Sequence, residues 1–238
     1  HQITALVRTP QAADALVSRG VTPVLGDLRT VKSYRGPAEG FDSYVHTAAD
    51  STAAREEIDR RAIDTLMAAA AARARTSACS FVYTSGVWVL GSNAQPMDET
   101  AQTSPGQLLT WRPVHVVRPG IVYGGNRGII SDLLKNALNG LIRVIGKGDN
   151  HWPLIYDRDL ADLYLRVATL PEAAGLYHAN DEADETVNTI VEGIVRHMSM
   201  PSDVRHVPLE EGRKKLGAYA DTLGLDQRVR GPRARALC

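Results

Sequence analysis

The sequence is poor in cysteine and has no surplus of either charge. Only two of its 238 residues are cysteine, Cys79 and Cys238, and they lack the spacing of a metal-ligand set. We expect both to be free thiols in a reducing compartment, and we expect no metal site. Lysine plus arginine number 27, as do aspartate plus glutamate, so no long-range field would gather nucleic acid or anionic lipid.

Long apolar runs are also missing. The alanine-rich stretch 66–78, "LMAAAAARARTSA", is interrupted by arginines well short of the length of a membrane span. No basic and apolar leader opens the chain. We therefore expect a soluble cytoplasmic protein with neither a membrane nor a nucleic acid as a partner.

What the sequence does contain is a regular alternation of apolar strands and helices. Predicted strands cover 2–7, 21–27, 41–50 (running into a loop), 81–86 and 114–120, and predicted helices cover 12–20 and 51–75, the latter opened by Ser51. Parallel strands need crossovers that return over the sheet, so this order predicts an α/β fold with a parallel sheet covered on both faces.

The pattern changes from Tyr123 onward. Amphipathic or short helices are predicted at 128–140, 157–170, 188–198 and 209–223, with a short strand at 141–146. This indicates a smaller second lobe, so we assign 1–122 together with 157–180 to one domain and 123–156 together with 181–238 to the other. The basic tail, 226–238, is expected to be a solvated end.

Two places suggest missing chain. A strand begins almost at His1 with no lead-in, and residues 92–113 join two apparently parallel strands without a convincing crossover helix. We expect residues to be absent before His1 and near the join of Pro113 and Val114.

Six stretches in this order give the chain its resemblance to a known family. They are "ITALVR", "VLGDL", "YVHTAAD", "FVYTSGVWVLG", "VVRPGIVYGG" and "NHWPLIYDRDLADLY". Together they resemble the second to sixth strands and the substrate lobe of the extended short-chain dehydrogenases/reductases, which include NAD(P)-dependent epimerases and dehydratases. The resemblance spans nearly the whole chain and implies a Rossmann-like, doubly wound parallel sheet with a smaller C-terminal substrate lobe.

The resemblance implies a dinucleotide site whose glycine-rich, pyrophosphate-binding loop would precede His1. Arg8 stands at the end of the strand that meets the adenosine ribose, where a guanidinium suits the 2′-phosphate of NADP. We therefore favour NADP over NAD, although a solvated strand-end arginine fits the same position equally well. The resemblance places further cofactor contacts at Asp27, Leu28, His46, Ala48, Ala49, Pro119, Gly120, Ile121 and Val122. Asp27 could instead be a turn aspartate, and His46 a satisfied core residue.

The family's catalytic pattern is only partly present. It pairs a Ser or Thr after the fifth strand with a Tyr four residues before a Lys, whose positive charge lowers the Tyr pKa. No lysine occurs between Lys32 and Lys135, and an ungapped count puts Gly86 at the hydroxyl position. We expect Ser85 to point into the active site, with Thr84 as the runner-up and Gly86 and Val87 near the substrate. The alternative is that these hydroxyls only cap strand-end backbone groups.

The substrate lobe differs from that of nucleotide-sugar enzymes. They often carry a phosphate-clamping arginine where this chain has Trp152, preceded by His151. A neutral aromatic cannot replace that clamp, so we favour a small carbonyl or hydroxyl substrate lined by His151 and Trp152. Core packing explains Trp152 at least as well. Asp157 and Asp159 are expected to be helix-start residues.

These observations favour an NADP-dependent oxidoreductase or epimerase-like enzyme acting by hydride transfer on a small molecule. A nucleotide-sugar epimerase or dehydratase is one alternative. A non-catalytic NAD(P)-binding sensor or assembly protein is another, because the Tyr and Lys pair is not visible. Homodimer formation is an expectation that the resemblance alone implies.

Overall fold

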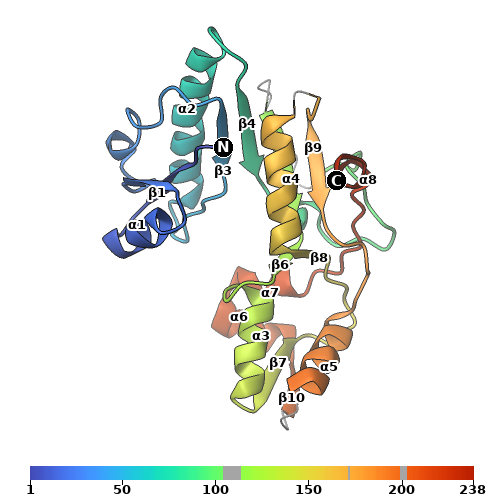
Figure 1. The fold of residues 1–238 in the computed structure, drawn as a ribbon. Helices are drawn as coiled ribbons and strands as arrows, with labels where there is room; N and C mark the ends of the chain where they lie inside the picture. Colours follow the sequence, from blue (N-terminus) through green and yellow to red (C-terminus); the bar gives the residue numbers. More distant parts are fainter. Residues whose placement is uncertain (104–113, 171, 199–202) are drawn as a thin grey trace. The chain divides into compact units, whose positions relative to one another are not determined.

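The computed structural model describes residues 1–103, 114–170, 172–198 and 203–238 (Figure 1). Two compact units make up the chain, His1–Tyr83 (unit 1) and Thr84–Cys238 (unit 2). The sequence places its domain boundary after Val122 instead, and that division stays a prediction.

Unit 1 alternates strands and helices along the chain. Its elements are β1 (Thr4–Val7), α1 (Pro10–Val17), β2 (Thr22–Leu25), the 3-10 turn η1 (Val31–Ser33), β3 (Ser43–His46), α2 (Arg55–Arg73) and β4 (Ser80–Thr84), whose last residue begins unit 2. The ladders β1–β2 and β3–β4 are both parallel. Helix α2 lies along β3 (Figure 1).

The two helices of unit 1 start in different ways. Helix α1 has a capping residue, since the Thr9 hydroxyl accepts a hydrogen bond from the Ala12 N–H at 3.2 Å and Pro10 fills the first helical position. Helix α2 begins at Arg55, not at Ser51 as predicted. The residues before it are held in a turn because the Asp50 carboxylate accepts the Thr52 N–H at 2.8 Å, an arrangement that competes with helix formation.

The core of unit 1 is built where α2 meets the sheet. Phe81 and Val82 of β4 are fully buried, as is Ala62 of α2, and Ile58 of α2 is 3% exposed. Burial of their apolar surface stabilises the unit and offsets the conformational entropy that the chain loses on folding.

Unit 2 contains the remaining elements. They are η2 (Val87–Leu90), β5 (Val114–Pro119), β6 (Ile121–Tyr123), α3 (Ile129–Leu138), β7 (Leu141–Ile145), β8 (Leu154–Tyr156), α4 (Asp157–Thr169), β9 (Leu176–Ala179), α5 (Val187–Met198), β10 (Asp203–Val207), α6 (Leu209–Leu216), α7 (Ala218–Leu223) and α8 (Pro232–Leu237). The ladders β5–β9, β6–β8 and β7–β10 are parallel.

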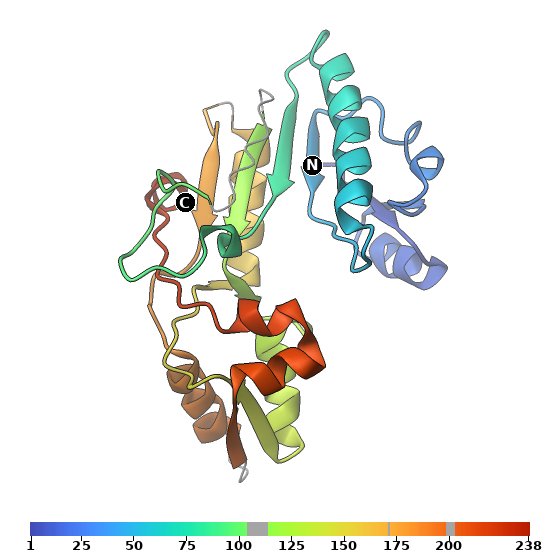
Figure 2. The same cartoon turned by 180° about the vertical axis from the view of Figure 1, so that it is seen from behind.

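Helices cover these ladders. Helix α4 packs on β5 and β8, α8 on β9, and α3 on β6, β7 and α5, while α6 and α7 pack on each other (Figure 2). One core cluster joins α3, β7 and α5 through Leu133, Ile142, Val144 and Val191. This cluster is formed by helices and parallel strands, as the α/β prediction requires.

The structure confirms the predicted α/β, Rossmann-like parallel fold, and Cys79 and Cys238 are both free thiols. The prediction that residues 226–238 form a solvated end is wrong, because Gln227 and Val229 are buried and α8 follows them. The predicted gap near Pro113 adjoins residues 104–113, which lie outside the described part of the chain, and it stays a prediction. No helix within the described residues combines the length and apolarity of a membrane span.

Candidate functional site

The predicted site residues fall into two groups, one in each unit. In unit 1, Arg8 follows the carboxyl end of β1, and Ala48 and Ala49 follow the end of β3; all three are exposed. Ligands of open α/β sheets bind beyond the carboxyl ends of parallel strands. Arg8, Ala48 and Ala49 therefore lie at the strand ends where the sequence predicts the adenosine end of a dinucleotide, and that contact stays a prediction.

Asp27 follows the carboxyl end of β2 and makes a turn of its own. Its Oδ1 accepts the backbone N–H of Arg29 at 2.9 Å, and its own N–H donates to Ser33 Oγ at 3.0 Å. Leu28 is partly buried, and its carbonyl accepts the hydroxyl of the buried Tyr34 at 3.4 Å. These contacts identify Asp27 as a turn aspartate. Its predicted contact with a cofactor stays a prediction.

Sequence reasoning missed an ion pair that joins two strand-end loops of unit 1. Arg29 Nε donates to Asp50 Oδ2 at 2.9 Å, which ties the loop after β2 to the loop after β3. Hydrogen bonds from the hydroxyl and the backbone N–H of Thr52, together with Arg29, lower the pKa of Asp50 to about 2. No spacing signal links positions 29 and 50, so only the fold reveals the pair.

His46, predicted to meet the cofactor, is 4% exposed and has a partner inside unit 1. Its Nε2 lies 2.7 Å from Asp59 Oδ1 of α2, and its ring stacks on Tyr83 at 5.9 Å between centroids. The Tyr83 hydroxyl donates to Asp59 Oδ2 at 3.0 Å, and burial together with the Asp59 charge raises the pKa of Tyr83 to about 12. His46 thus matches the satisfied core histidine that the sequence left open.

In unit 2, Thr84 and Ser85 have different environments. Thr84 Oγ1 lies 2.6 Å from the hydroxyl of Tyr164 on α4, and burial raises the pKa of that tyrosine. The Ser85 N–H donates to Val117 O of β5 at 2.8 Å, and among the described residues no side-chain hydrogen bond of Ser85 is found. Within the described part of the chain, the Thr84 hydroxyl is therefore the one with a side-chain partner, and the predicted substrate contact of Ser85 stays a prediction.

Thr84→Val should therefore cost stability while Ser85→Ala should not. Removing the Thr84 hydroxyl leaves the partly buried Tyr164 hydroxyl without its partner, which costs about 1–2 kcal/mol. Ser85→Ala is expected to change the free energy of unfolding by less than about 0.5 kcal/mol. Urea denaturation of both variants measures this, and equal losses would contradict the assignment of the hydrogen bond to Thr84.

Gly86 and Val87 lie just beyond Ser85. Gly86 has extended backbone, and a Cβ built on it would lie 3.9 Å from Pro119 O, so the position has room for a side chain. Val87 is 1% exposed and packs with Leu90 and Val229, which places its side chain in the core.

The predicted nicotinamide loop, Pro119 to Val122, runs from β5 into β6. The Gly120 N–H donates to Ala179 O at 2.9 Å, and the Ile121 N–H donates to Pro153 O at 2.7 Å. Ile121 belongs to the same core cluster as Trp152, whereas Pro119 and Val122 are partly exposed. The loop is therefore pinned on both sides by backbone hydrogen bonds.

His151 is bound to the C-terminal segment. Its Nδ1 lies 2.8 Å from Asp226 Oδ1, which also accepts its backbone N–H at 2.9 Å, and its Nε2 lies 3.2 Å from Arg228. Burial tends to raise the pKa of Asp226, but the hydrogen bonds from His151 and the nearby Arg228 outweigh it, so the pKa is lowered. The predicted substrate contact of His151 stays a prediction.

Trp152 is 6% exposed and donates its indole N–H to Leu223 O at 3.1 Å. It belongs to the core cluster that joins α3, β7 and α5 and also lines a cavity of about 310 Å³. Both readings of the sequence, core packing and pocket lining, therefore apply to this one side chain.

A buried basic group lies on β5 and β9. Arg118 and His178 are paired in register, 4% and 0% exposed, with Arg118 Nη1 3.5 Å from His178 Nε2. Burial and the Arg118 charge lower the pKa of His178 to about 4, and burial alone lowers the pKa of His115. Within the described ranges, no cluster of three or more His, Cys, Asp or Glu residues could hold a metal ion.

Comparison with known proteins supports the fold. No protein-family model matches the chain. An uncharacterised fission yeast protein, C2A9.02 of Schizosaccharomyces pombe, is 26% identical over 246 residues, covering 95% of this chain and 81% of that protein.

Two solved structures are similar over 99% of the chain. The dTDP-glucose 4,6-dehydratase DesIV of Streptomyces venezuelae, with NAD bound, gives a TM-score of 0.76 at 19% identity over 81% of its length. The human epimerase family protein SDR39U1, with NADPH, gives 0.72 at 18% identity over 93%. The chain thus has the fold of the extended short-chain dehydrogenases/reductases, which is also the fold of the NAD(P)-dependent epimerases and dehydratases.

Proposed function

We propose that the protein is an NADP-dependent oxidoreductase or epimerase-like enzyme that acts on a small carbonyl or hydroxyl compound, with NAD as the alternative cofactor. The observation that carries the proposal is the exposed Arg8 guanidinium at the carboxyl end of β1, in a chain with this fold. Bound at these strand ends, the cofactor would supply hydride transfer. Arg8 would hold the 2′-phosphate, and Ala48 and Ala49 would leave room for the adenosine.

The proposed roles in unit 2 are positional. Ser85 would hold the substrate oxygen by a hydrogen bond, and the loop Pro119 to Val122 would pack against the nicotinamide. The pinned backbone of Gly120 and Ile121 supports a rigid loop.

Two alternatives remain as proposals. A nucleotide-sugar epimerase or dehydratase is favoured by the likeness to DesIV, but the neutral Trp152 cannot clamp a diphosphate. A non-catalytic NAD(P)-binding protein is favoured by Gly86 at the family's hydroxyl position and by the Thr84 hydroxyl being taken by Tyr164.

Arg8→Glu should change the choice of cofactor. A charge-assisted hydrogen bond contributes roughly 1.5–3 kcal/mol, so we expect NADPH to bind about 10- to 100-fold more weakly. NADH, which lacks the 2′-phosphate, should bind no more weakly than before. Fluorescence titration with both dinucleotides measures the ratio.

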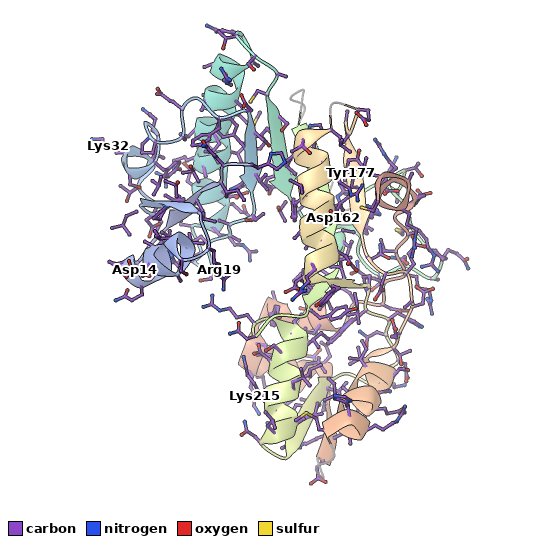
Figure 3. All side chains as sticks on the ribbon, viewed as in Figure 1. Asp14, Arg19, Lys32, Asp162, Tyr177 and Lys215 are labelled. Atoms are coloured by element: carbon purple, nitrogen blue, oxygen red, sulfur yellow. The ribbon has the colours of Figure 1, made fainter. Side chains whose placement is uncertain are left out.

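Arg19→Glu is the matched control, because Arg19 is an exposed arginine beyond the end of α1 (Figure 3). It should leave both affinities nearly unchanged. Equal effects of the two substitutions, or unaltered NADPH binding by Arg8→Glu, would refute the role of Arg8.

A further inference from the structure

The cavity of unit 2 has an apolar floor. Leu133, Val144, Trp152 and Val187 line it, and all four are buried members of one core cluster. Trp152 has a single hydrogen-bond donor, and Leu223 O already accepts it, so the indole offers a ligand only apolar surface. At about 310 Å³ the cavity is at the small end of the range for ligand pockets. It therefore fits a compact apolar body.

The rim of the cavity has an uncompensated positive charge. Asp132 pairs with Lys135 at 3.1 Å, and Lys215 (labelled in Figure 3) lies 3.8 Å from Glu211. Arg143 is exposed, and no carboxylate of the described residues lies within 4.0 Å of it.

Arg143 also has a like-charged neighbour. Its partner in the β7–β10 ladder is Arg205, a second exposed arginine. Like charges at paired positions of a ladder repel each other, and an anion bound near them relieves that repulsion. The rim thus favours a ligand with one negative group.

One ring of an exposed aromatic pair lines the cavity. Trp88 and Tyr219 meet edge to face with ring centroids 6.1 Å apart, and 38% and 43% of their surfaces are exposed. Tyr219 also lines the cavity. Large exposed aromatics beside a hollow are typical of surfaces that receive a ring.

We propose that this cavity binds a small arylcarboxylate, with its ring on the apolar floor beside Tyr219 and its carboxylate on Arg143. That such a molecule is the substrate rests on the proposed function; the binding site itself does not. Arg143 is a specificity-determining residue in this arrangement, because a planar fork matches a carboxylate in two-point contact.

Isothermal titration calorimetry with phenylacetate, cinnamate and the neutral phenylacetamide tests the site. We expect both acids to bind the wild-type protein more tightly than the amide does. Arg143→Gln should weaken acid binding about tenfold or more and leave the amide unchanged. Arg196→Gln, at an exposed arginine in the last turn of α5, is the matched control and should bind all three as the wild type does.

Three results of the titration with these three compounds would overturn the proposal. They are no binding of either acid, equal binding of acid and amide, or unaltered acid binding by Arg143→Gln with a wild-type melting temperature. Tighter binding of UDP-glucose than of both acids would also overturn it. NADPH titration of the same samples separates the proposed function from the arylcarboxylate site. A protein that binds the acids but not NADPH would contradict the proposed function and leave the arylcarboxylate site standing.

Discussion

Gly120→Ala is expected to destabilise the protein by about 3 kcal/mol or more. A Cβ at this position would lie 2.3 Å from Pro153 O and 2.9 Å from Pro153 C, both of them backbone atoms. The backbone would have to shift, yet it is pinned there by the hydrogen bonds from Gly120 to Ala179 and from Ile121 to Pro153. The glycine is thus required by close chain crossing, independently of any cofactor.

Thermal and urea unfolding of Gly120→Ala measure this loss. Gly193→Ala is the control, because Gly193 lies inside α5 with no atom within 4 Å of an added Cβ. Alanine is the better helix former by roughly 0.5–1 kcal/mol, so this variant should be as stable as the wild type or more so. A Gly120→Ala protein with wild-type stability would show that the crossing is not as tight as described.

Acid should destabilise the protein through His178. The ring is fully buried between Arg230 O, 3.2 Å from Nδ1, and Arg118, 3.5 Å from Nε2. Its pKa is about 4 in the folded state against an ordinary 6.5. Between these values the unfolded chain binds a proton that the folded chain does not, so stability is lost as the pH falls from about 6.5 to about 4.

The expected loss is at most roughly 3.5 kcal/mol, because the pKa falls from 6.5 to about 4 and each pKa unit corresponds to about 1.4 kcal/mol. His115, whose pKa burial also lowers, adds to it in the same direction. His178→Gln should flatten the pH dependence of the free energy of unfolding in this window, whatever its effect at neutral pH. His197→Gln, at an exposed position of α5, should keep the wild-type slope. An unchanged slope in His178→Gln would assign the acid sensitivity elsewhere.

The regular helices were predictable because local periodicity and end signals determine them. Helix α4 begins at Asp157, and α1 ends within three residues of Gly20, as the sequence indicates. The start of α2 was not predictable, since Asp50 holds the preceding turn through contacts with both Thr52 and a distant arginine.

Elements held by distant contacts were missed. Strand β10 has an almost wholly exposed pattern without alternation, so only its ladder with β7 defines it. The tail looked solvated because its arginines dominate its composition. Gln227 is nevertheless buried, with its amide donating to Val87 O and Gly91 O at 2.9 Å each. No local pattern foretells a contact across more than a hundred residues.

The same limit applies to the site. The motifs located the ends of the strands, and they marked Arg8, Ser85 and the Gly120 loop as candidate site residues. The partners that decide what each side chain does, such as Asp59 for His46 and Tyr164 for Thr84, lie on helices whose relation to the strands only the fold supplies.

Melting the protein with NADPH, NADH, UDP-glucose or no ligand tests the central claim most directly. A ligand that binds only the folded state stabilises it by about 2.7 kcal/mol at a hundred times its Kd. We predict a clear rise in Tm with NADPH, a smaller one with NADH and none with UDP-glucose. An unchanged Tm with both dinucleotides would contradict the account.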